Sequence, residues 1–365
     1  MNKERYNRQI MLQGFGMPAQ MRLTGSAVLV IGAGGLGCPA LQYLAAAGIG
    51  TIGIVDDDVV SLSNLHRQVL FTTEDIGKLK VEIAAKRLQQ MNPEISINTY
   101  AVKIDKSNVI DILNYYDVIL DGTDNFAARY LINDACALLH KPLIFAAVSG
   151  CEGQLAVFNV PDNQNESTNY RDIFPVQPKE GEIPNCAENG ILGVLPGVIG
   201  TIAATEVIKF ITKTGTPLIN KLRHYNILSG EQYEINISPA NHYTLPKTAT
   251  ELSNMEYEDS CKVSQNYIEI DAKELKSLQN QPSTLVIDVR ERHEFPKLND
   301  PFITQAPMSE LEELLNQNIT QEKIVFICQH GIRSLSAAEA FHEKYGNTKK
   351  IYSLKGGIVK WRNHF

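Results

Sequence analysis

The turn that follows the first apolar segment constrains the fold of this chain more than any other feature. The stretch VLVIGAGGLG starts at Val28 and joins a predicted strand, Ala27–Ile31, to a turn that contains Gly32, Gly34 and Gly37. Glycines at this spacing allow a tight turn and let a phosphate approach the backbone amides at the start of the next helix. The stretch therefore predicts a nucleotide-binding unit. Taken alone, it suits an NAD enzyme as well as an ATP enzyme, and a purely structural turn is a further alternative.

Short apolar segments alternate with helical ones through the first half of the chain, which is typical of parallel strands joined by crossover helices. Further strands are predicted at 51–56, 95–100, 117–121 and 143–147, and helices at 36–47, 78–91 and 125–139. Antiparallel strands are predicted at 153–158, 223–228 and 232–237. The predicted fold class is α/β, with a Rossmann-like, mostly parallel sheet and an antiparallel extension.

A second, small α/β unit is predicted after a polar segment. From Ser238 to Gln265 the chain is polar, contains prolines and has no clear period, which indicates a linker. Beyond it, strands are predicted at 267–271, 284–288, 324–328 and 350–353, and helices at 272–278, 335–345 and 357–362. Since 365 residues are too many for one ordinary domain, we expect domains over 1–245 and 266–365 with a linker over 246–265.

Charge and hydropathy argue against two classes of partner. The formal net charge is −7 and the pI is about 5.7, so no nucleic acid or anionic membrane is expected to bind. The most apolar window, Ile191–Ile211, contains Pro196, Glu206 and Lys209, which favours a buried helix over 197–212 rather than a membrane span. Because the first residues lack an apolar signal-peptide core, we expect a cytoplasmic protein.

Charged side chains gather where the predicted strands end. Asp56 ends a strand at the spacing expected for a carboxylate that holds ribose hydroxyls, and SLSNLHRQVLF, which contains Arg67, follows it. Lys80 comes next, and LDGTDN places Asp124 at a later strand end. Each residue alone could be a solvated surface charge, but together they suit adenylation, in which a carboxylate attacks the α-phosphate of ATP and both reactants are anionic. Arg67 and Lys80 can neutralise the repulsion, and Asp124 can hold Mg²⁺ on the phosphates.

These motifs resemble the MoeB/ThiF family, the prokaryotic relatives of ubiquitin-activating enzymes. The resemblance covers residues 1 to 237 and is carried by YNRQI, GAGGLG, the DDD and SLSNLHRQ block, GKLK and DGTDN. It implies a homodimer that adenylates the C-terminal Gly-Gly carboxylate of a ubiquitin-like sulfur carrier protein, and in which Arg8 reaches the nucleotide of the other subunit. The implied ATP-binding residues are Gly32, Gly34, Gly35, Gly37, Asp56, Ser63, Asn64, Leu65, His66, Arg67, Lys80, Asp124 and Asn125.

The resemblance also implies a reactive cysteine at Cys186, on a loop that crosses the active site. Its expected role is in the covalent exchange that follows adenylation, and the alternative is an inert small residue. The family commonly holds a structural zinc ion with two CxxC pairs, whose matching places here are Asn169-Tyr-Arg-Asp172 and Cys261-Lys-Val-Ser264. Because three of the four ligands are missing and the six cysteines form no CxxC pair, no structural zinc is predicted.

A second nucleophilic cysteine is predicted near the other end of the chain, in CQHGIRS. Cys328 ends a predicted strand, the loop after it can turn its amide N–H groups inward, and Ser334 can cap the next helix. The helix N-terminus and Arg333 would favour a thiolate and stabilise a persulfide. The arginine is fifth after the cysteine, a loop length that resembles rhodanese, although the pattern would also serve phosphatase chemistry.

The surroundings of this loop, VIDVRERHEF and YSLKGGIVKW, resemble the rhodanese sulfurtransferase domain over residues 266 to 365. The family's Gly-His-Ile-Pro-Gly segment is replaced by PKLNDPFITQAPMSEL, so the shape of the pocket rim is not predicted. Asp288 and Arg290 are expected to be structural, and His330 is expected to be an exposed loop residue.

Together the two units predict one reaction sequence. The carrier's C-terminal glycine would attack ATP, and a persulfide on Cys328, loaded by a cysteine desulfurase or by thiosulfate, would convert the acyl-adenylate into a thiocarboxylate. The molybdopterin-synthase small subunit is the favoured carrier, with a thiamine-pathway carrier or a tRNA-thiolation carrier as alternatives. Two other classes stay open: an NAD-dependent oxidoreductase with an appended rhodanese unit, and a non-catalytic scaffold for ubiquitin-like proteins.

Overall fold

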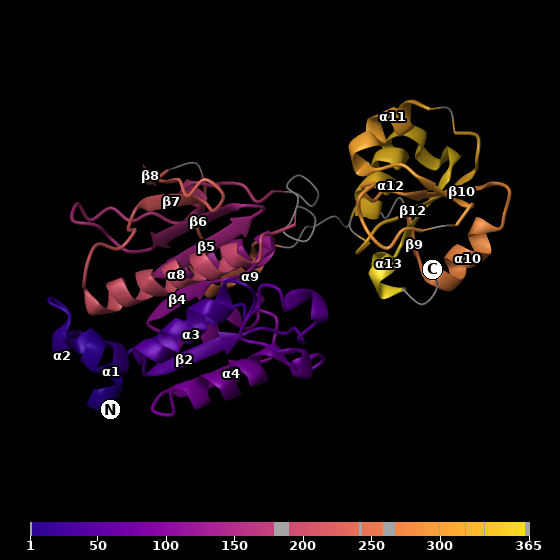
Figure 1. The fold of residues 1–365 in the computed structure, drawn as a ribbon. Helices are drawn as coiled ribbons and strands as arrows, with labels where there is room; N and C mark the ends of the chain where they lie inside the picture. The colour runs from indigo at the N-terminus through magenta and orange to yellow at the C-terminus, as the bar shows by residue number, and fades with distance from the viewer. Residues whose placement is uncertain are drawn as a thin grey trace. The chain divides into compact units, whose positions relative to one another are not determined.

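The chain forms two compact units, Met1–Asp259 and Ser260–Phe365 (Figure 1). The computed structural model describes residues 2–178, 190–240, 243–257, 267–298, 300–317, 319–331 and 333–361. Each unit has its own sheet and its own hydrophobic clusters, so each one buries a core without the other.

An eight-stranded sheet forms the centre of the first unit, in the order β3-β2-β1-β4-β5-β6-β7-β8. The strands from β3 to β5 in this order pair in parallel, and β5 to β8 pair antiparallel, which confirms the predicted sheet. The strand order reverses at β1, and ligands of open α/β sheets bind at such a point. The strands are β1 Ala27–Ile31, β2 Thr51–Val55, β3 Ser96–Tyr100, β4 Val118–Asp121, β5 Leu143–Ser149, β6 Glu152–Phe158, β7 Lys221–Asn226 and β8 Gln232–Asn236.

Helices cover both faces of this sheet. The helices α3, α4 and α8 share one hydrophobic cluster with Val28 and Val30, whereas α5, α6 and α9 share another with Leu29 and Ile31, as the two-residue period of a strand requires. The helices of this unit are α1 Lys3–Ile10, α2 Gly16–Thr24, α3 Gly37–Ala47, α4 Lys80–Met91, α5 Val109–Asn114, α6 Phe126–Leu138, α8 Val194–Thr212 and α9 Ala249–Asn254, with 3-10 turns η1 Leu62–Asn64, η2 Thr73–Asp75 and η3 Tyr170–Asp172.

The most apolar helix, α8, lies in the core. Among the described residues it is the one helix whose length and composition would allow it to cross a membrane. It packs instead against α3 and β5, with Leu195 and Ile199 fully buried, and its Glu206 forms an ion pair with Lys209 at 2.6 Å. The prediction of a buried helix is confirmed. The helix begins three residues before the predicted start because Pro196 falls in its first turn, where a missing N–H costs no hydrogen bond.

Part of the predicted linker, residues 246–265, packs on the first unit. Residues Ala249–Asn254 form α9, whose Leu252 is fully buried against α6. The Tyr257 hydroxyl donates to the buried Asp134 carboxylate at 2.8 Å. The sequence analysis did not predict this helix, because a short helix anchored by isolated apolar side chains has no periodic signature.

The second unit contains a five-stranded parallel sheet in the order β11-β10-β12-β13-β9. Its strands are β9 Ile268–Ile270, β10 Thr284–Asp288, β11 Ile303–Gln305, β12 Lys323–Ile327 and β13 Lys350–Leu354. Its helices are α10 Ala272–Gln279, α11 Leu311–Asn316, α12 Arg333–Tyr345 and α13 Gly357–Lys360, with 3-10 turns η4 Met308–Glu310 and η5 Gly346–Thr348. The sequence analysis missed the edge strand β11, which has three residues and is mostly exposed. The loop that starts at Cys328 directly follows β12.

Candidate functional site

The glycine turn after β1 packs too closely on its surroundings for a side chain at two positions. Gly32 has a φ of 94° and donates its N–H to the carbonyl of Val55 at 2.8 Å, and a Cβ there would lie 2.8 Å from the carbonyl oxygen of Gly122. A Cβ on Gly37 would lie 1.8 Å from the carbonyl oxygen of Gly32. The turn therefore presents bare backbone where β1, β4 and the start of α3 meet.

A cavity of about 200 Å³ opens beside this turn, at the carboxyl ends of β1, β2 and β4. The predicted residues that line it are Gly32, Gly34, Gly35, Asp56, Asn64, Arg67, Lys80, Asp124 and Asn125. The remaining predicted residues of this unit do not line it: Gly37, Ser63, Leu65, His66 and Arg8. Leu65 packs against the hydrophobic cluster of α3 and α8, and Arg8 is exposed on α1.

Asp56 and Lys80 form a charged wall of this cavity. The Asp56 carboxylate accepts the N–H of Ala33 at 2.7 Å and that of Asp58 at 2.9 Å. Lys80 is 3% exposed, donates to the Asp58 carboxylate at 2.7 Å and lies 3.9 Å from that of Asp56. Burial raises the pKa of Asp56, and the Lys80 ammonium opposes that rise. The lysine is thus a cation held in place and largely screened from water.

Arg67, Asn64 and Asp124 reach the cavity from other segments. The Asn64 side chain accepts the Ser61 hydroxyl at 2.8 Å, and the Arg67 guanidinium donates to the carbonyl of Ser63 at 3.1 Å. The described part of the chain contains no group of three or more metal-ligating side chains. Asp124 fits a different kind of site, because Mg²⁺ is usually held by one or two carboxylates together with substrate phosphates.

A buried ion pair supports the turn that carries Asp124, and the sequence analysis did not single it out. Asp121 accepts the N–H of Thr123 at 2.9 Å and its hydroxyl at 2.6 Å. Arg129 lies 3.5 Å from the other carboxylate oxygen of Asp121 and donates to the carbonyl of Thr123 at 2.8 Å. Burial raises the pKa of Asp121, and the guanidinium opposes that rise. Asp121 and Arg129 both contact Thr123, so the pair fixes the turn between the end of β4 and Asp124.

A larger, mostly apolar cavity of about 480 Å³ adjoins the first one. The residues that line both are Leu36, Thr123, Asp124 and Val148. The aromatic side chains Phe126, Tyr130, Tyr170 and Phe174 also line the larger cavity. The sequence analysis missed this cavity because its lining comes from α6, β5, β6, η3 and β7, and no single segment carries a signal.

A hydrogen-bonded polar cluster occupies one of the places that the family resemblance links to zinc. Asp172 accepts the N–H of Asn169 at 2.7 Å, the N–H of Ala240 at 2.6 Å and the hydroxyl of Tyr243 at 2.5 Å. The Asn169 side chain donates to the Tyr243 hydroxyl at 2.6 Å. Tyr243, which lies beyond β8, thus contacts both ends of this turn. Cys261, the one cysteine left at the zinc-ligand positions, lies outside the described residues, as does the predicted reactive cysteine, Cys186.

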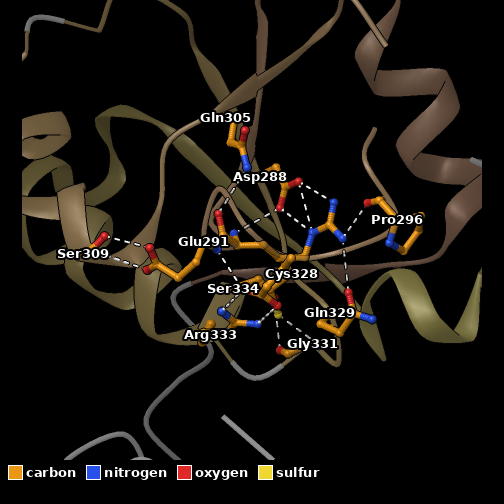
Figure 2. Close-up of polar contacts among 12 residues, drawn as sticks. Asp288, Glu291, Pro296, Gln305, Ser309, Cys328, Gln329, Gly331, Arg333 and Ser334 are labelled. Carbon is orange, nitrogen blue, oxygen red and sulfur yellow. Dashed lines mark hydrogen bonds and ion pairs between the residues drawn. The ribbon is translucent and has the colours of Figure 1, made fainter. Parts of the chain in front are cut away.

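In the second unit, Cys328 is held at the start of the loop between β12 and α12 (Figure 2). Its Sγ accepts the N–H of Gly331 at 3.1 Å and lies 3.4 Å from the hydroxyl oxygen of Ser334. The Ser353 hydroxyl donates to that of Ser334 at 2.9 Å. Gly331 has a φ of 90°, and a Cβ there would lie 2.7 Å from the nitrogen of Gly356. The loop presents the N–H of Gly331 to the sulfur, a contact that suits a nucleophilic thiolate.

Arg333 has a partner that the sequence analysis did not indicate. Its guanidinium donates to both carboxylate oxygens of Glu294, at 2.6 and 2.8 Å. Burial alone would raise the pKa of Glu294, but the hydrogen bonds from Arg333 hold it below the usual range. Arg333 is therefore paired with a carboxylate, a partner for the charge that the sequence analysis assigned to favouring the thiolate. Asp288 and Arg290 form a buried ion pair at 2.8 Å, in line with the expected structural role.

Comparison with known proteins matches both units. The ThiF family matches residues 6–245, and the rhodanese-like domain matches residues 271–364. The chain is 48% identical over 226 residues to the sulfur carrier protein adenylyltransferase of Thermus thermophilus, covering 62% of this chain and 83% of that protein. It is 38% identical over 369 residues to the probable adenylyltransferase/sulfurtransferase MoeZ of Mycobacterium tuberculosis, covering 98% and 92%. The crystal structure of E. coli MccB with ATP superposes with a TM-score of 0.57 at 26% identity, over 67% of this chain and 75% of that chain.

Proposed function

Because this chain belongs to the ThiF family and continues into a rhodanese-like domain, we propose that it activates and then thiolates the C-terminal carboxylate of a ubiquitin-like sulfur carrier protein. The names of its relatives support both halves of the proposal: a sulfur carrier protein adenylyltransferase matches the first unit, and an adenylyltransferase/sulfurtransferase matches both.

The observation that carries the proposal is the convergence of Arg67, Lys80 and Asp124 on one cavity beside the glycine turn. The carrier's terminal carboxylate attacks the α-phosphate of ATP, and pyrophosphate leaves. Lys80 and Arg67 offset the repulsion between the two anionic reactants, while Asp56 accepts a ribose hydroxyl. A magnesium ion held by Asp124 would add positive charge at the phosphate oxygens. The relative MccB is named as crystallised with ATP, which supports a nucleotide in this place.

The apolar cavity suits the tail of the carrier protein. It adjoins the nucleotide cavity through Leu36, Thr123, Asp124 and Val148. A tail bound against Phe126 and the other aromatic side chains would direct its terminal glycine toward the α-phosphate. Glycine suits the junction because it has no side chain to pass between the shared residues.

The second unit supplies the sulfur in this proposal. The terminal sulfur of a Cys328 persulfide attacks the acyl carbon, AMP leaves, and the carrier is joined to Cys328 through an acyl disulfide. A second thiol, for which we propose Cys186, attacks the Cys328 sulfur and releases the thiocarboxylate. Two equivalents of a cellular thiol then reduce the Cys186–Cys328 disulfide and leave as their own disulfide, which returns both cysteines to thiols.

Partners and assembly extend the proposal. The favoured carrier is the molybdopterin-synthase small subunit. The enzyme itself is proposed to be a cytoplasmic homodimer. Its Cys328 receives sulfur from a cysteine desulfurase or from thiosulfate. Arg8 is exposed on α1, and the residues after that helix, Met11 and Leu12, are 69% and 60% exposed. We place the contact with the second subunit here, so that Arg8 reaches the partner's nucleotide.

Mass spectrometry of carriers tests the function and identifies the substrate. The protein is incubated with ATP, Mg²⁺, a sulfur source and, in turn, the molybdopterin, thiamine-pathway and tRNA-thiolation carriers. The expected product is a carrier in which one oxygen has been replaced by sulfur. Nicotinamide-cofactor binding without pyrophosphate exchange would support an oxidoreductase instead, and the absence of exchange with every diglycine-tailed carrier would refute the proposal.

A further inference from the structure

The guanidinium of Arg333, which lies beside the Cys328 loop in Figure 2, is held by a fixed carboxylate. It donates to the two oxygens of Glu294 at 2.6 and 2.8 Å, and the two side chains are only 19% and 21% exposed. The backbone N–H of Glu291 donates to the same carboxylate at 2.7 Å, which fixes Glu294 independently of the arginine. Paired contacts of this geometry are among the stronger side-chain interactions. The pair therefore contributes no net charge to the loop.

The other arginine at this loop is neutralised in the same way. Arg290 is 2% exposed and donates to the Asp288 carboxylate at 2.8 Å. It also donates to the side chain of Gln329, the residue next to Cys328, at 3.2 Å. Among the described residues, the two arginines Arg290 and Arg333 are thus each matched by a carboxylate of the same unit.

The two kinds of sulfur donor place different demands on such a loop. Thiosulfate is a small dianion that must approach a thiolate, and without net positive charge the two repel each other. A persulfide on a donor protein carries one negative charge, and contacts remote from the reacting sulfur can supply its binding free energy. The N–H of Gly331 can bind the transferred sulfur in either case.

We propose that Glu294 determines the class of sulfur donor: by holding Arg333 it disfavours inorganic thiosulfate and favours a persulfide carried on a protein. The inference rests on the proposed sulfur transfer and names its donor class. In the step, the Cys328 thiolate attacks the outer sulfur of the donor persulfide. The S–S bond of the donor breaks, its electron pair leaves on the donor's thiolate, and Cys328–S–S⁻ forms. With thiosulfate the leaving group would be sulfite.

Glu294→Gln in the full chain tests this assignment. The amide keeps the shape of the side chain but frees the charge of Arg333 for the sulfonate group of thiosulfate. In a thiosulfate–cyanide sulfurtransferase assay at about pH 8, where ordinary imidazoles are neutral, we expect kcat/KM to rise roughly tenfold through a lower KM. The gain should shrink as salt screens the attraction.

The matched control is Glu310→Gln. It makes the same change of charge in the same unit and breaks a more exposed pair of the same kind, Arg292 with Glu310 at 2.6 Å, so kcat/KM for thiosulfate should stay unchanged. Persulfide loading of Cys328 from a cysteine desulfurase supplied with cysteine, followed by peptide mass, should be equal in both variants and the wild type. A Glu294→Gln enzyme that uses thiosulfate no better than the wild type, or gains equally with the desulfurase, overturns the inference.

The salt dependence of the wild-type enzyme provides a second test, and this test needs no variant. Since the two described arginines at the loop are both paired with carboxylates, kcat/KM for thiosulfate should rise or stay level as salt is added, and a steep fall would overturn the inference. Carrier-dependent ATP–pyrophosphate exchange is measured beside it. Absence of exchange would count against the proposed function of the first unit, whereas intact exchange with a failed thiosulfate comparison would count only against the role of Glu294.

Discussion

Lys80→Met removes an ammonium group from the wall of the proposed nucleotide cavity while keeping an unbranched apolar side chain. In the wild type Lys80 is 3% exposed, donates to Asp58 at 2.7 Å and lies 3.9 Å from Asp56. Water cannot replace a cation at so buried a position. The phosphates of a bound ATP would therefore lose a charge that is in place before the reaction begins.

The size of the loss follows from this burial. Removing one preorganised donor for developing negative charge typically costs about 2.7–4 kcal/mol of transition-state stabilisation, or roughly 10²–10³ in kcat. The fold should tolerate the change. Burial already raises the pKa of Asp56, and loss of the opposing ammonium raises it further, so the carboxyl can take up a proton instead of staying as a buried lone charge.

The assay is carrier-dependent ATP–pyrophosphate exchange, with Lys78→Met as the matched control. That variant removes the same charge two residues earlier, where the ammonium is 55% exposed and 3.9 Å from Asp75. Exposed pairs of this kind contribute about 0–1 kcal/mol, so exchange should be unchanged. Equal losses in the two variants, or an exchange rate for Lys80→Met indistinguishable from the wild type, would refute the role of Lys80.

Three further predictions address other parts of the chain. Cys328→Ser should abolish persulfide and thiocarboxylate formation but leave ATP–pyrophosphate exchange intact, and a loss of exchange would contradict the division of labour between the units. Asp134→Asn should lower the free energy of unfolding in urea by about 3–5 kcal/mol, because Asp134 is fully buried and pairs with Arg171 at 2.8 Å; an unchanged value would show that the pair adds nothing. Burial raises the pKa of Cys38 to about 12, so iodoacetamide at about pH 8 should leave this thiol unmodified in the native protein, and its alkylation there, detected by peptide mass, would contradict the burial.

The grouping of residues around the cavity beside the glycine turn could be predicted from the sequence because its parts follow neighbouring parallel strands. Gly32 follows β1, Asp56 follows β2, and Asp124 comes shortly after β4. The carboxyl ends of adjacent parallel strands lie at one edge of a sheet, so side chains far apart in the chain are brought together by topology alone. Local patterns of glycine and charge were therefore sufficient to find this cavity.

The features that the sequence analysis missed depend on contacts without a local pattern. Glu294 and Arg333 meet across 39 residues, and nothing in the spacing of either indicates the other. The apolar cavity is assembled from helix, strand and 3-10 turn, each of which contributes one or a few side chains. The helix α9 is anchored by Leu252, which is too little for a periodic signal.

The helix α8 also has a consequence for synthesis of the chain. A segment this apolar could be bound by membrane-insertion machinery as it leaves the ribosome. By then β1, α3, β4, β5 and β6 have already been translated, so the surface that will cover the helix precedes it in time. Glu206 and Lys209 would also be costly in lipid. Because its packing partners are synthesised first, α8 can be buried against them as it emerges, which disfavours its insertion into a membrane.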